Sequence, residues 1–299
     1  MSSIREMRLR IRSIKSIAQV TRALEAVSAS KVRQATQMVN ATHPYAEKAW
    51  KVLLHLVRQP GHTSLHPLLT ERAKKQKALI ILVTSDRGLA GAYNNNILRY
   101  AFHAEDEMMM PVDFIAVGRK GRDLLIRRRK NVIAEFSQLP TPTTFMDVSY
   151  LGRLVVDDYL NGTYDQIFIA FTEFHTLAHQ QTVIRKLLPL EVTYANDGEG
   201  GYNVTHHRAS SVFTYEPDDR LILDQIIPRF TAIQIYQSIL SAQASEHAAR
   251  MVAMRNSTDN AYELTGMLQL EYNKLRQSMI TSELLDIVGG SEALVKSNS

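Results

Sequence analysis

The sequence lacks cysteine altogether and is short of long apolar runs. With no cysteine among the 299 residues, a disulfide scaffold, a thiolate metal site and a cysteine nucleophile are all excluded. The longest unbroken apolar run, Ala78–Val83, is far shorter than the roughly 20 residues that a bilayer-spanning helix needs. The rest of the composition, 45% hydrophobic and 22% charged, is ordinary for a globular protein. It excludes collagen-like, low-complexity and wholly disordered chains.

Acidic residues are scarce near the N-terminus. Residues 1–60 contain 11 Lys and Arg against 3 Asp and Glu, residues 61–217 are balanced, and residues 218–299 contain 7 against 10. The net charge of +5 therefore comes from one basic segment, which predicts an acidic partner such as protein, nucleic acid or lipid headgroup. Nucleic acid is disfavoured, because residues 1–44 contain no Phe, Tyr or Trp on which bases could stack.

Glycine and proline are absent from residues 1–43, so nothing there interrupts a helix. Apolar residues recur every three or four positions, mostly away from the basic ones. The pattern predicts a long amphipathic helix that is bent near Pro44 and ends before Pro60. The first 22 residues share the Arg and Ser content of a transit peptide, but the helical pattern continues beyond them, which favours a permanent element. The predicted stripe is Ile4, Met7, Ile11, Ile14, Ile17, Leu24 and Val27.

A second and longer helical pattern fills the C-terminal quarter. No proline follows Pro228, and Gly266 is the only glycine before Gly289. A period close to 3.5 residues, sustained this long, predicts a left-handed coiled coil over about Asp218–Val288. We expect the two terminal helices to pair antiparallel. The predicted stripe is Ile226, Phe230, Ile233, Gln237, Leu240, Ala244, Ala248, Met251, Met254, Thr258, Ala261, Leu264, Leu268, Tyr272, Leu275 and Met279.

The middle of the chain has the texture of a parallel sheet covered by helices. Near-continuous apolar strands alternate with helical stretches, which is typical of an α/β domain. A further strand pair is expected within Gln180–Tyr194, and the glycine-rich residues 195–217 are expected to be a loop. The predicted strands are 78–84, 112–117, 131–136 and 166–171, and the predicted helices are 94–109, 119–129 and 145–161.

These patterns predict an α/β chain: a long antiparallel coiled coil of N- and C-terminal helices with an inserted Rossmann-like parallel-sheet domain. The expected domain boundaries are 1–60 for the N-terminal helix, 76–195 for the central domain and 218–289 for the C-terminal helix.

The positions where chemistry would be expected do not carry the required residues. The turn Ser85–Ala92 after the first strand lacks the glycine spacing of a dinucleotide fingerprint, and no Gly-Lys-Ser/Thr phosphate loop occurs. His175 and His179 are spaced as helical metal ligands but have neither a third ligand nor a glutamate between them, which favours surface or hairpin histidines. We therefore predict no cofactor, no metal and no catalytic residue.

Three segments resemble the gamma subunits of F-type ATP synthases, the central rotor shaft of those complexes. They are the N-terminal helix with Ile11–Ile17 and Val27–Lys31, the strand and turn Val83–Asn94, and the C-terminal helix with Ser245–Ala261 and Ile280–Gly290. The resemblance spans nearly the whole chain. It implies a coiled coil inside a ring of three alpha and three beta subunits, with the central domain near the epsilon subunit and the membrane c-ring.

The resemblance also implies which residues contact the ring. Rotor–stator contacts are expected at Leu24, Arg276, Gln277, Thr281 and Glu283. For these the plain alternative is a solvated or coil-packing residue, and for Leu24 it is a coil-packing residue, because leucine is ordinary in a coil seam. A hydrophobic bearing is expected at Leu284, Leu285, Ile287 and Val288. Contacts with acidic loops of the beta subunits are hypothesised for Arg8, Arg12, Arg22, Lys31 and Arg33.

The implied function is a non-catalytic rotor subunit that couples ion-driven rotation of the c-ring to conformational change in the beta subunits. The missing cysteines exclude the thiol regulation of chloroplast-type members and favour a peripheral protein on the cytoplasmic face of a bacterial plasma membrane. Two alternatives stay open. A stand-alone coiled-coil scaffold would self-associate, and an enzyme built on the central sheet would bind a nucleotide by itself.

Overall fold

The computed structural model describes residues 4–57, 66–190 and 219–297 of the chain. It divides into two compact units, one made of residues 28–250 and the other of residues 1–27 with 251–299. The long helices α1 (Ile4–Val57) and α5 (Asp219–Ser297) contribute to both. Each unit is described by itself below.

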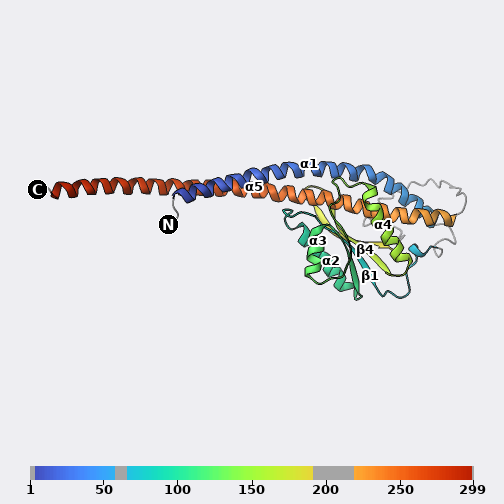
Figure 1. Ribbon diagram of the computed structural model, residues 1–299. Helices are drawn as coiled ribbons and strands as arrows, with labels where there is room; N and C mark the ends of the chain where they lie inside the picture. The colour runs from blue at the N-terminus through green and yellow to red at the C-terminus, as the bar shows by residue number, and fades with distance from the viewer. Residues whose placement is uncertain (1–3, 58–65, 191–218, 298–299) are drawn as a thin grey trace. The chain divides into compact units, whose positions relative to one another are not determined.

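The larger unit contains a five-stranded sheet in the order β3-β2-β1-β4-β5. Strands β1 to β4 are parallel, and β5 pairs antiparallel with β4 at the edge. Helices α2 and α3 lie on one side of the sheet, and α4 and α5 on the other (Figure 1). The strands are β1 (Ala78–Val83), β2 (Val112–Val117), β3 (Val132–Phe136), β4 (Gln166–Phe174) and β5 (Gln180–Leu188), and the shorter helices are η1 (Pro67–Leu69), α2 (Tyr93–Met108), α3 (Arg119–Arg127) and α4 (Phe145–Leu160).

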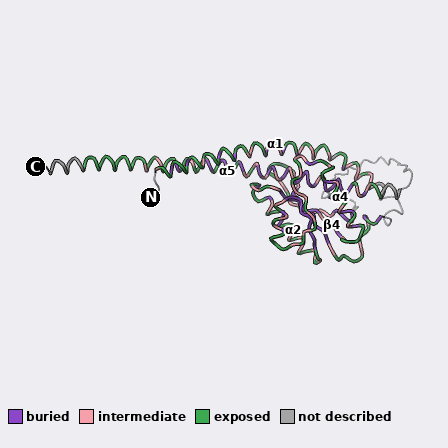
Figure 2. The backbone as a smooth tube through the Cα atoms, viewed as in Figure 1, coloured by how far each residue is buried: buried purple, intermediate pink, exposed green. Residues whose placement is uncertain are grey.

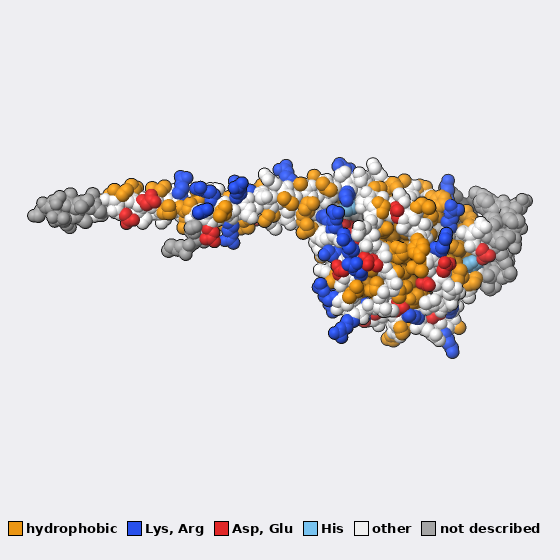
Figure 3. All heavy atoms as spheres, viewed as in Figure 1, with side chains coloured by type: hydrophobic (Ala, Val, Ile, Leu, Met, Phe, Trp, Pro, Cys, Tyr) orange, Lys and Arg blue, Asp and Glu red, His pale blue; other side chains and the backbone are white. Residues whose placement is uncertain are grey.

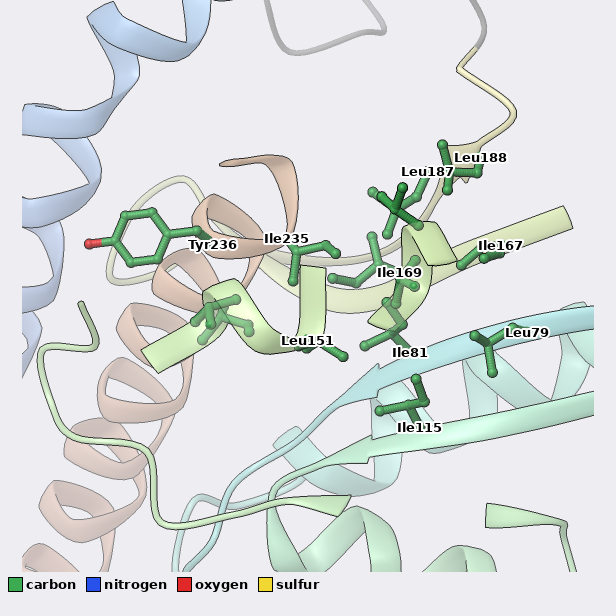
Figure 4. Packing of buried hydrophobic residues seen from close by; sticks show 14 of the residues in the cluster. Leu79, Ile81, Ile115, Leu151, Ile167, Ile169, Leu187, Leu188, Ile235 and Tyr236 are labelled. Carbon is green, nitrogen blue, oxygen red and sulfur yellow. The ribbon is translucent and has the colours of Figure 1, made fainter. Parts of the chain in front are cut away.

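The period-two alternation of β1 separates two hydrophobic cores. Leu79, Ile81 and Val83 face one cluster, while Ala78, Ile80 and Leu82 face the other. Because both faces are covered, every residue of this strand is buried. Figure 4 shows side chains of the first cluster from β1, β2 and β4 converging with Leu151 of α4 and Ile235 of α5. The long C-terminal helix is thus part of the central domain's own core.

The predicted strands and helices of the central domain are confirmed to within a few residues, with one error. A single strand, β5, replaces the strand pair expected within Gln180–Tyr194, whose residues after 190 lie outside the described part, as does the predicted loop 195–217. The turn after Phe174 is short, and a strand that follows such a turn pairs antiparallel with its predecessor. The sheet is therefore mixed rather than wholly parallel.

The long helices are continuous through the prolines that they contain, and α5 is also continuous through Gly289. Helix α1 contains Pro44 and α5 contains Pro228. Helix α5 also continues past Gly289, where the sequence predicted its end, to Ser297. A proline lacks one backbone N–H donor, and a glycine lacks a side chain. Either defect weakens a helix locally, but the remaining hydrogen bonds of α1 and α5 keep both helices continuous.

In the smaller unit, α1 and α5 pair antiparallel. Arg8 Nη2 donates to the Tyr272 hydroxyl at 2.9 Å, and the hydroxyls of Thr21 and Thr258 lie 2.7 Å apart. Partner numbers on α5 fall as those on α1 rise, which defines the antiparallel direction. Met7 and Ile11 pack with Leu268 in the seam. The predicted antiparallel pairing is confirmed.

The seam follows steps of three and four in strict alternation, which places the predicted Ile17, Leu24, Val27 and Leu264 outside it. Ile17 and Val27 are 52% and 54% exposed, whereas the neighbouring Ala18 and Ser28 are buried. Leu264 is likewise 44% exposed, and Thr265 takes its place. Two consecutive steps of three, such as Ile11 to Ile14 to Ile17, rotate off a stripe of period 3.5. The seam thus buries a small residue where the sequence offers a larger one beside it.

Candidate functional site

The C-terminal part of α5 is exposed on every side. Residues 276–289 are all exposed, and α5 appears there as an exposed tube leading to the C-terminus (Figure 2). The predicted contacts Arg276, Gln277, Thr281 and Glu283 all lie in this segment. The last seam residue that packs with α1 is Leu275. Helix α5 then continues to Ser297, roughly 33 Å further at 1.5 Å per residue.

The predicted bearing residues form the apolar end of α5, defined as Leu284, Leu285, Ile287 and Val288. Their side chains are 58%, 67%, 69% and 56% exposed. At 3.6 residues per turn they fall within an arc of roughly 160°. Large apolar side chains clustered on a protein surface mark an interaction site. Their exposure agrees with a helix surface that binds a partner.

Leu24 belongs to a second apolar row on α1 that the sequence pattern merged with the seam. Ile17, Val20 and Val27 are 52%, 57% and 54% exposed, and Leu24 between them is half-buried. Steps of three and four place all four on one side of the helix, next to the seam. The row offers an apolar strip beside the coil. The sequence could have distinguished this row from the seam, because the steps between seam residues alternate strictly between three and four.

The five predicted basic contacts are not equivalent. Arg12, Arg22 and Arg33 are exposed. Arg8 is engaged within the chain, donating to Tyr272 and lying with its guanidinium 5.8 Å from the centre of that ring. Lys31 is half-buried and interacts electrostatically with Glu246 and His247. Two of the five basic residues therefore have partners in their own chain.

Two of the three segments that carry the family resemblance meet in the larger unit. We call the meeting point the arginine junction: Arg87, Gly88, Glu246, His247 and Arg250. Arg250 donates to the carbonyls of Gly88 and Arg87 at 3.2 and 3.3 Å and to the Glu246 carboxylate at 2.7 Å. The same guanidinium lies 3.2 Å from His247 Nδ1. One side chain of α5 thus ties this helix to the turn after β1.

Burial controls the ionisation of the junction. Because arginine only donates, His247 Nδ1 must accept, which fixes the neutral tautomer with its proton on Nε2. Burial lowers the pKa of His247 to about 4, and the positive charges of Arg250 and Lys31 act in the same direction. Burial raises the pKa of the Glu246 carboxyl, and Arg250 opposes that rise. These residues lie in segments that carry the family resemblance, but the sequence did not predict their contact.

The turn after β1 is committed to structural hydrogen bonds. The Asp86 carboxylate accepts from the backbone N–H groups of Arg119 at 3.0 Å and Gln138 at 2.8 Å. Gly118 has a φ of 99°, and a Cβ at that position would lie 2.3 Å from the Thr84 carbonyl oxygen. The Asp86 carboxylate and the close contact of Gly118 with Thr84 hold the loops at this edge together. A phosphate would be repelled by the carboxylate and would find these two backbone N–H groups already bonded to it.

Helix α5 occupies the place where this fold class holds a nucleotide. In an open α/β sheet, ligands bind outside the carboxyl ends of the strands, at the switch between β1 and β4 here. Phe174 N–H at the end of β4 donates to Ser241 of α5 at 2.8 Å, and Ser245 donates to the Thr172 carbonyl at 3.0 Å. The space left between α5 and the ends of β1, β2 and β3 has a volume of about 50 Å³. This is room for a water molecule and not for a nucleotide.

The two spaced histidines lie at the β4–β5 hairpin. Their ring centres are 5.3 Å apart, and His175 is 3.9 Å from Glu173. In the part of the chain that the structure describes, no group of three or more metal-ligating side chains comes together. Across the same residues, no helix has both the length and the apolar content to cross a lipid bilayer.

Residues 3–294 match the model of the ATP synthase family. An ATP synthase gamma chain of Roseiflexus sp. (strain RS-1) is 40% identical over 99% of this chain and 100% of its own, and one of Dehalococcoides mccartyi (strain CBDB1) is 41% identical over 98% and 100%. The chain belongs to the ATP synthase gamma-chain family. As a member it is a non-catalytic subunit of the central stalk.

Solved structures share the fold. The first is a chain in the OSCP/F1/c-ring structure of the Euglena gracilis mitochondrial ATP synthase in rotational state 3. It has a TM-score of 0.68 and 21% identity over 99% of this chain and 96% of its own. A chain in the rotor structure of the same synthase in rotational state 1 has a TM-score of 0.63 and 19% identity over 93% and 98%. The predicted architecture of paired terminal helices around a sheet domain is confirmed.

Proposed function

We propose that this chain turns within the ring of alpha and beta subunits, with the apolar end of α5 as its bearing and the exposed faces of α1 and α5 as the surfaces that the ring contacts. Its partners are the alpha and beta subunits, the epsilon subunit and the c-ring of an ATP synthase. The observation that carries the proposal is the segment 276–289 of α5, exposed on all sides and ending in an apolar cluster. Such a surface requires a surrounding partner.

The shaft acts by holding three chemically identical sites in different states. This requires each conformation of a beta subunit to contact a different face of the shaft with a different free energy. The segment supplies chemically unlike contacts: Arg276 and Gln277 are polar and point about 100° apart, Glu283 is acidic and lies two turns further along the helix, and the apolar end follows. Low charge at the apolar end, where Asp286 is the one ionisable side chain among residues 284–288, would avoid strong attachment to any one orientation. The apolar row with Leu24 provides a further distinct face.

The exposed basic residues of α1 support contacts with acidic loops of the beta subunits. Arg12, Arg22 and Arg33 point to solvent and carry the hypothesis, whereas Arg8 and Lys31 would have to leave partners in their own chain. Reversing the charge at Arg22 and Arg33 together should weaken assembly or coupling, more so at low salt. Arg5→Glu with Arg10→Glu, on the same helix, is the matched control. Unchanged behaviour of the Arg22 and Arg33 variant would remove the hypothesis.

We further propose that the chain is a peripheral protein on the cytoplasmic face of a bacterial plasma membrane, associated with it only through the complex. The ATP synthase is membrane-associated, and bacterial gamma chains cover nearly the whole chain. Fractionation of cells should place the chain with the membranes and release it when the ring is stripped from them. Release of the chain alone, with the ring retained, would contradict a stalk enclosed by that ring.

The decisive experiment mixes the full chain with alpha and beta subunits from the same organism. Native mass spectrometry should find one copy with three of each, and this complex should hydrolyse ATP faster than alpha and beta alone. Replacing Arg276, Gln277 and Glu283 by alanine should lower that rate several-fold. The matched control replaces Lys274, Gln269 and Glu271, which are exposed on the same helix. Self-association without entry into the ring would instead favour the coiled-coil scaffold.

A further inference from the structure

A groove lies between α2 and α3, on the side of the sheet away from α5. Its volume is about 520 Å³, and its lining comes from Leu98, Arg99 and Phe102 of α2 and from Leu124 and Arg128 at α3. All of these belong to the larger unit. Neither the seam nor the apolar end includes any of them.

The floor of the groove is apolar and held in place from below. Leu98 is 5% exposed and belongs to the second core cluster, against which Phe102 and Leu124 also pack. The Phe102 ring meets the buried Phe114 edge-on, with centroids 6.4 Å apart. Lys130 fixes one side, because its ammonium lies 5.5 Å from the Phe102 ring and 2.7 Å from Glu105. The groove therefore exists before anything binds to it.

The rim of the groove is positively charged. Arg99 and Arg128 are exposed, and no ion pair or hydrogen bond from their side chains is found among the described residues. Other basic residues of the same helix are occupied. Arg119 faces Asp86 at 3.7 Å, and Arg122 contacts Glu135 at 2.9 Å. Lys and Arg side chains gather over the α3 region of the surface (Figure 3).

From this geometry we propose that the α2–α3 groove docks an acidic amphipathic helix of a partner protein. Apolar side chains spaced three and four residues apart would lie on Leu98, Phe102 and Leu124, as in other helix-in-groove interfaces. Asp or Glu side chains along the edge of that helix would pair with Arg99 and Arg128, whose planar guanidinium groups suit carboxylates. Asp106 at the rim would repel a wrongly placed acid and so set the register.

A protein helix fits this site better than an anionic membrane does. A bilayer surface is broad and flat, so its headgroups could reach the arginines but would leave the apolar floor uncovered. The hollow between two helices instead matches a rod with an apolar stripe. Acidic vesicles are therefore the competing outcome of the test.

The test uses the full chain and two synthetic 18-residue helices that share an apolar stripe, one with Glu and one with Lys on its flanks. Fluorescence anisotropy should show binding of the acidic peptide, and Arg99→Glu with Arg128→Glu should weaken it at least tenfold while improving binding of the basic peptide. Arg153→Glu, an exposed arginine on α4, is the matched control. Equal binding of both peptides, or no effect of the double reversal, would overturn the proposal.

The site itself is located by cross-linking. Because the chain has no cysteine, Asn95→Cys in the groove creates its only thiol, which can carry a benzophenone. This variant should cross-link to the acidic peptide, and the same probe at Ser149→Cys on α4 should not. Adducts at Ser149 alone, or binding of phosphatidylglycerol vesicles that the acidic peptide cannot displace, would reject the groove. Neither result bears on ring assembly, which the mass measurement above tests separately.

Discussion

One helix, α5, has two regions in opposite surroundings. Residues 227–250 are mostly buried all round, between α1, α4 and the sheet, whereas residues 276–289 are exposed all round. Both regions mix apolar and polar side chains. In the first, buried hydroxyls donate to carbonyls: Thr231 to Ile227, Ser238 to Gln234 and Ser245 to Thr172. In the second, apolar side chains stand in solvent.

Burial of α5 therefore does not follow from its local hydrophobicity. The first region is stabilised by partners in the same chain, so substitutions there should change the stability of the isolated protein. The second region has its partners elsewhere, so substitutions there should change assembly and leave stability alone. The predictions below test this contrast in order of decreasing effect.

The largest effect is expected at Arg250. Arg250→Met leaves Glu246 buried without its counter-charge, which costs about 3–5 kcal/mol of unfolding free energy. Urea denaturation of the full chain followed by circular dichroism measures it. Adding Glu246→Gln should recover part of the loss, and Arg255→Met, at an exposed position five residues on, should cost less than about 0.5 kcal/mol. A small effect at Arg250 would mean that the junction does not hold α5.

The junction should also make stability depend on pH through His247. The folded pKa is about 4 against 6.5 for the free side chain, so between these values the unfolded chain binds the additional proton. Unfolding free energy should therefore fall as the pH drops from 6.5 to 4, by about 3 kcal/mol from this residue. His247→Asn should flatten that slope relative to the parent, and the exposed His103→Asn should not. Parallel slopes for parent and His247→Asn would contradict neutral burial.

Replacing two helical glycines by alanine should change the unfolding free energy in opposite directions. A Cβ at Gly152 of α4 would lie 2.7 Å from the Ala232 Cβ and 3.0 Å from its Cα, so Gly152→Ala should destabilise by about 1–3 kcal/mol. Gly266 of α5 has no such neighbour within 4 Å. Gly266→Ala should stabilise by about 0.5–1 kcal/mol, because alanine is the better helix former. Thermal denaturation of both variants checks the signs, and a stabilising effect of Gly152→Ala would refute the close α4–α5 contact.

A smaller effect is expected in the seam of the smaller unit. Thr258→Val leaves the Thr21 hydroxyl without its buried partner and should cost about 1 kcal/mol. The double variant with Thr21→Val should be nearly neutral, since both polar groups are then gone. A double-mutant cycle measured by denaturation gives the coupling. Strictly additive losses would show that the two hydroxyls do not interact in solution.

The smallest effect on stability is expected at the apolar end. Leu284→Ser with Ile287→Ser should change the unfolding free energy of the isolated chain by less than about 0.5 kcal/mol, because both side chains are already exposed. The same variant should lower ATP hydrolysis in the reconstituted complex. Unfolding that shifts markedly while hydrolysis stays unchanged would reverse the roles of the two regions.

Much of this fold could be predicted from the sequence, because its elements are locally encoded. Continuous apolar strands, such as Ala78–Val83, and helices without glycine or proline leave few alternatives. The residues of the seam between α1 and α5 were harder to predict. Ala18, Ser28 and Thr265 are small or polar and give no hydrophobic signal, and each lies next to a larger apolar residue that is exposed. Only the alternation of steps identifies them.

The candidate site was predictable as a segment but not as a set of contacts. The family resemblance locates residues 276–288, and their exposure agrees with a surface that binds partners. The arginine junction could not be predicted, since it joins residues more than 150 positions apart through backbone carbonyls, which leave no trace in the side-chain pattern. The same is true of Gly152 against Ala232.

The position of α5 at the carboxyl ends of β1 to β4 also determines whether a nucleotide can bind to this subunit. A fold whose open edge commonly receives a nucleotide here has that edge filled by its own helix, down to a space of about 50 Å³. Among the residues that the structure describes, no space of nucleotide size is left at this edge. We therefore expect that neither ATP nor ADP binds there and that rotation of the subunit does not depend on either nucleotide occupying this edge.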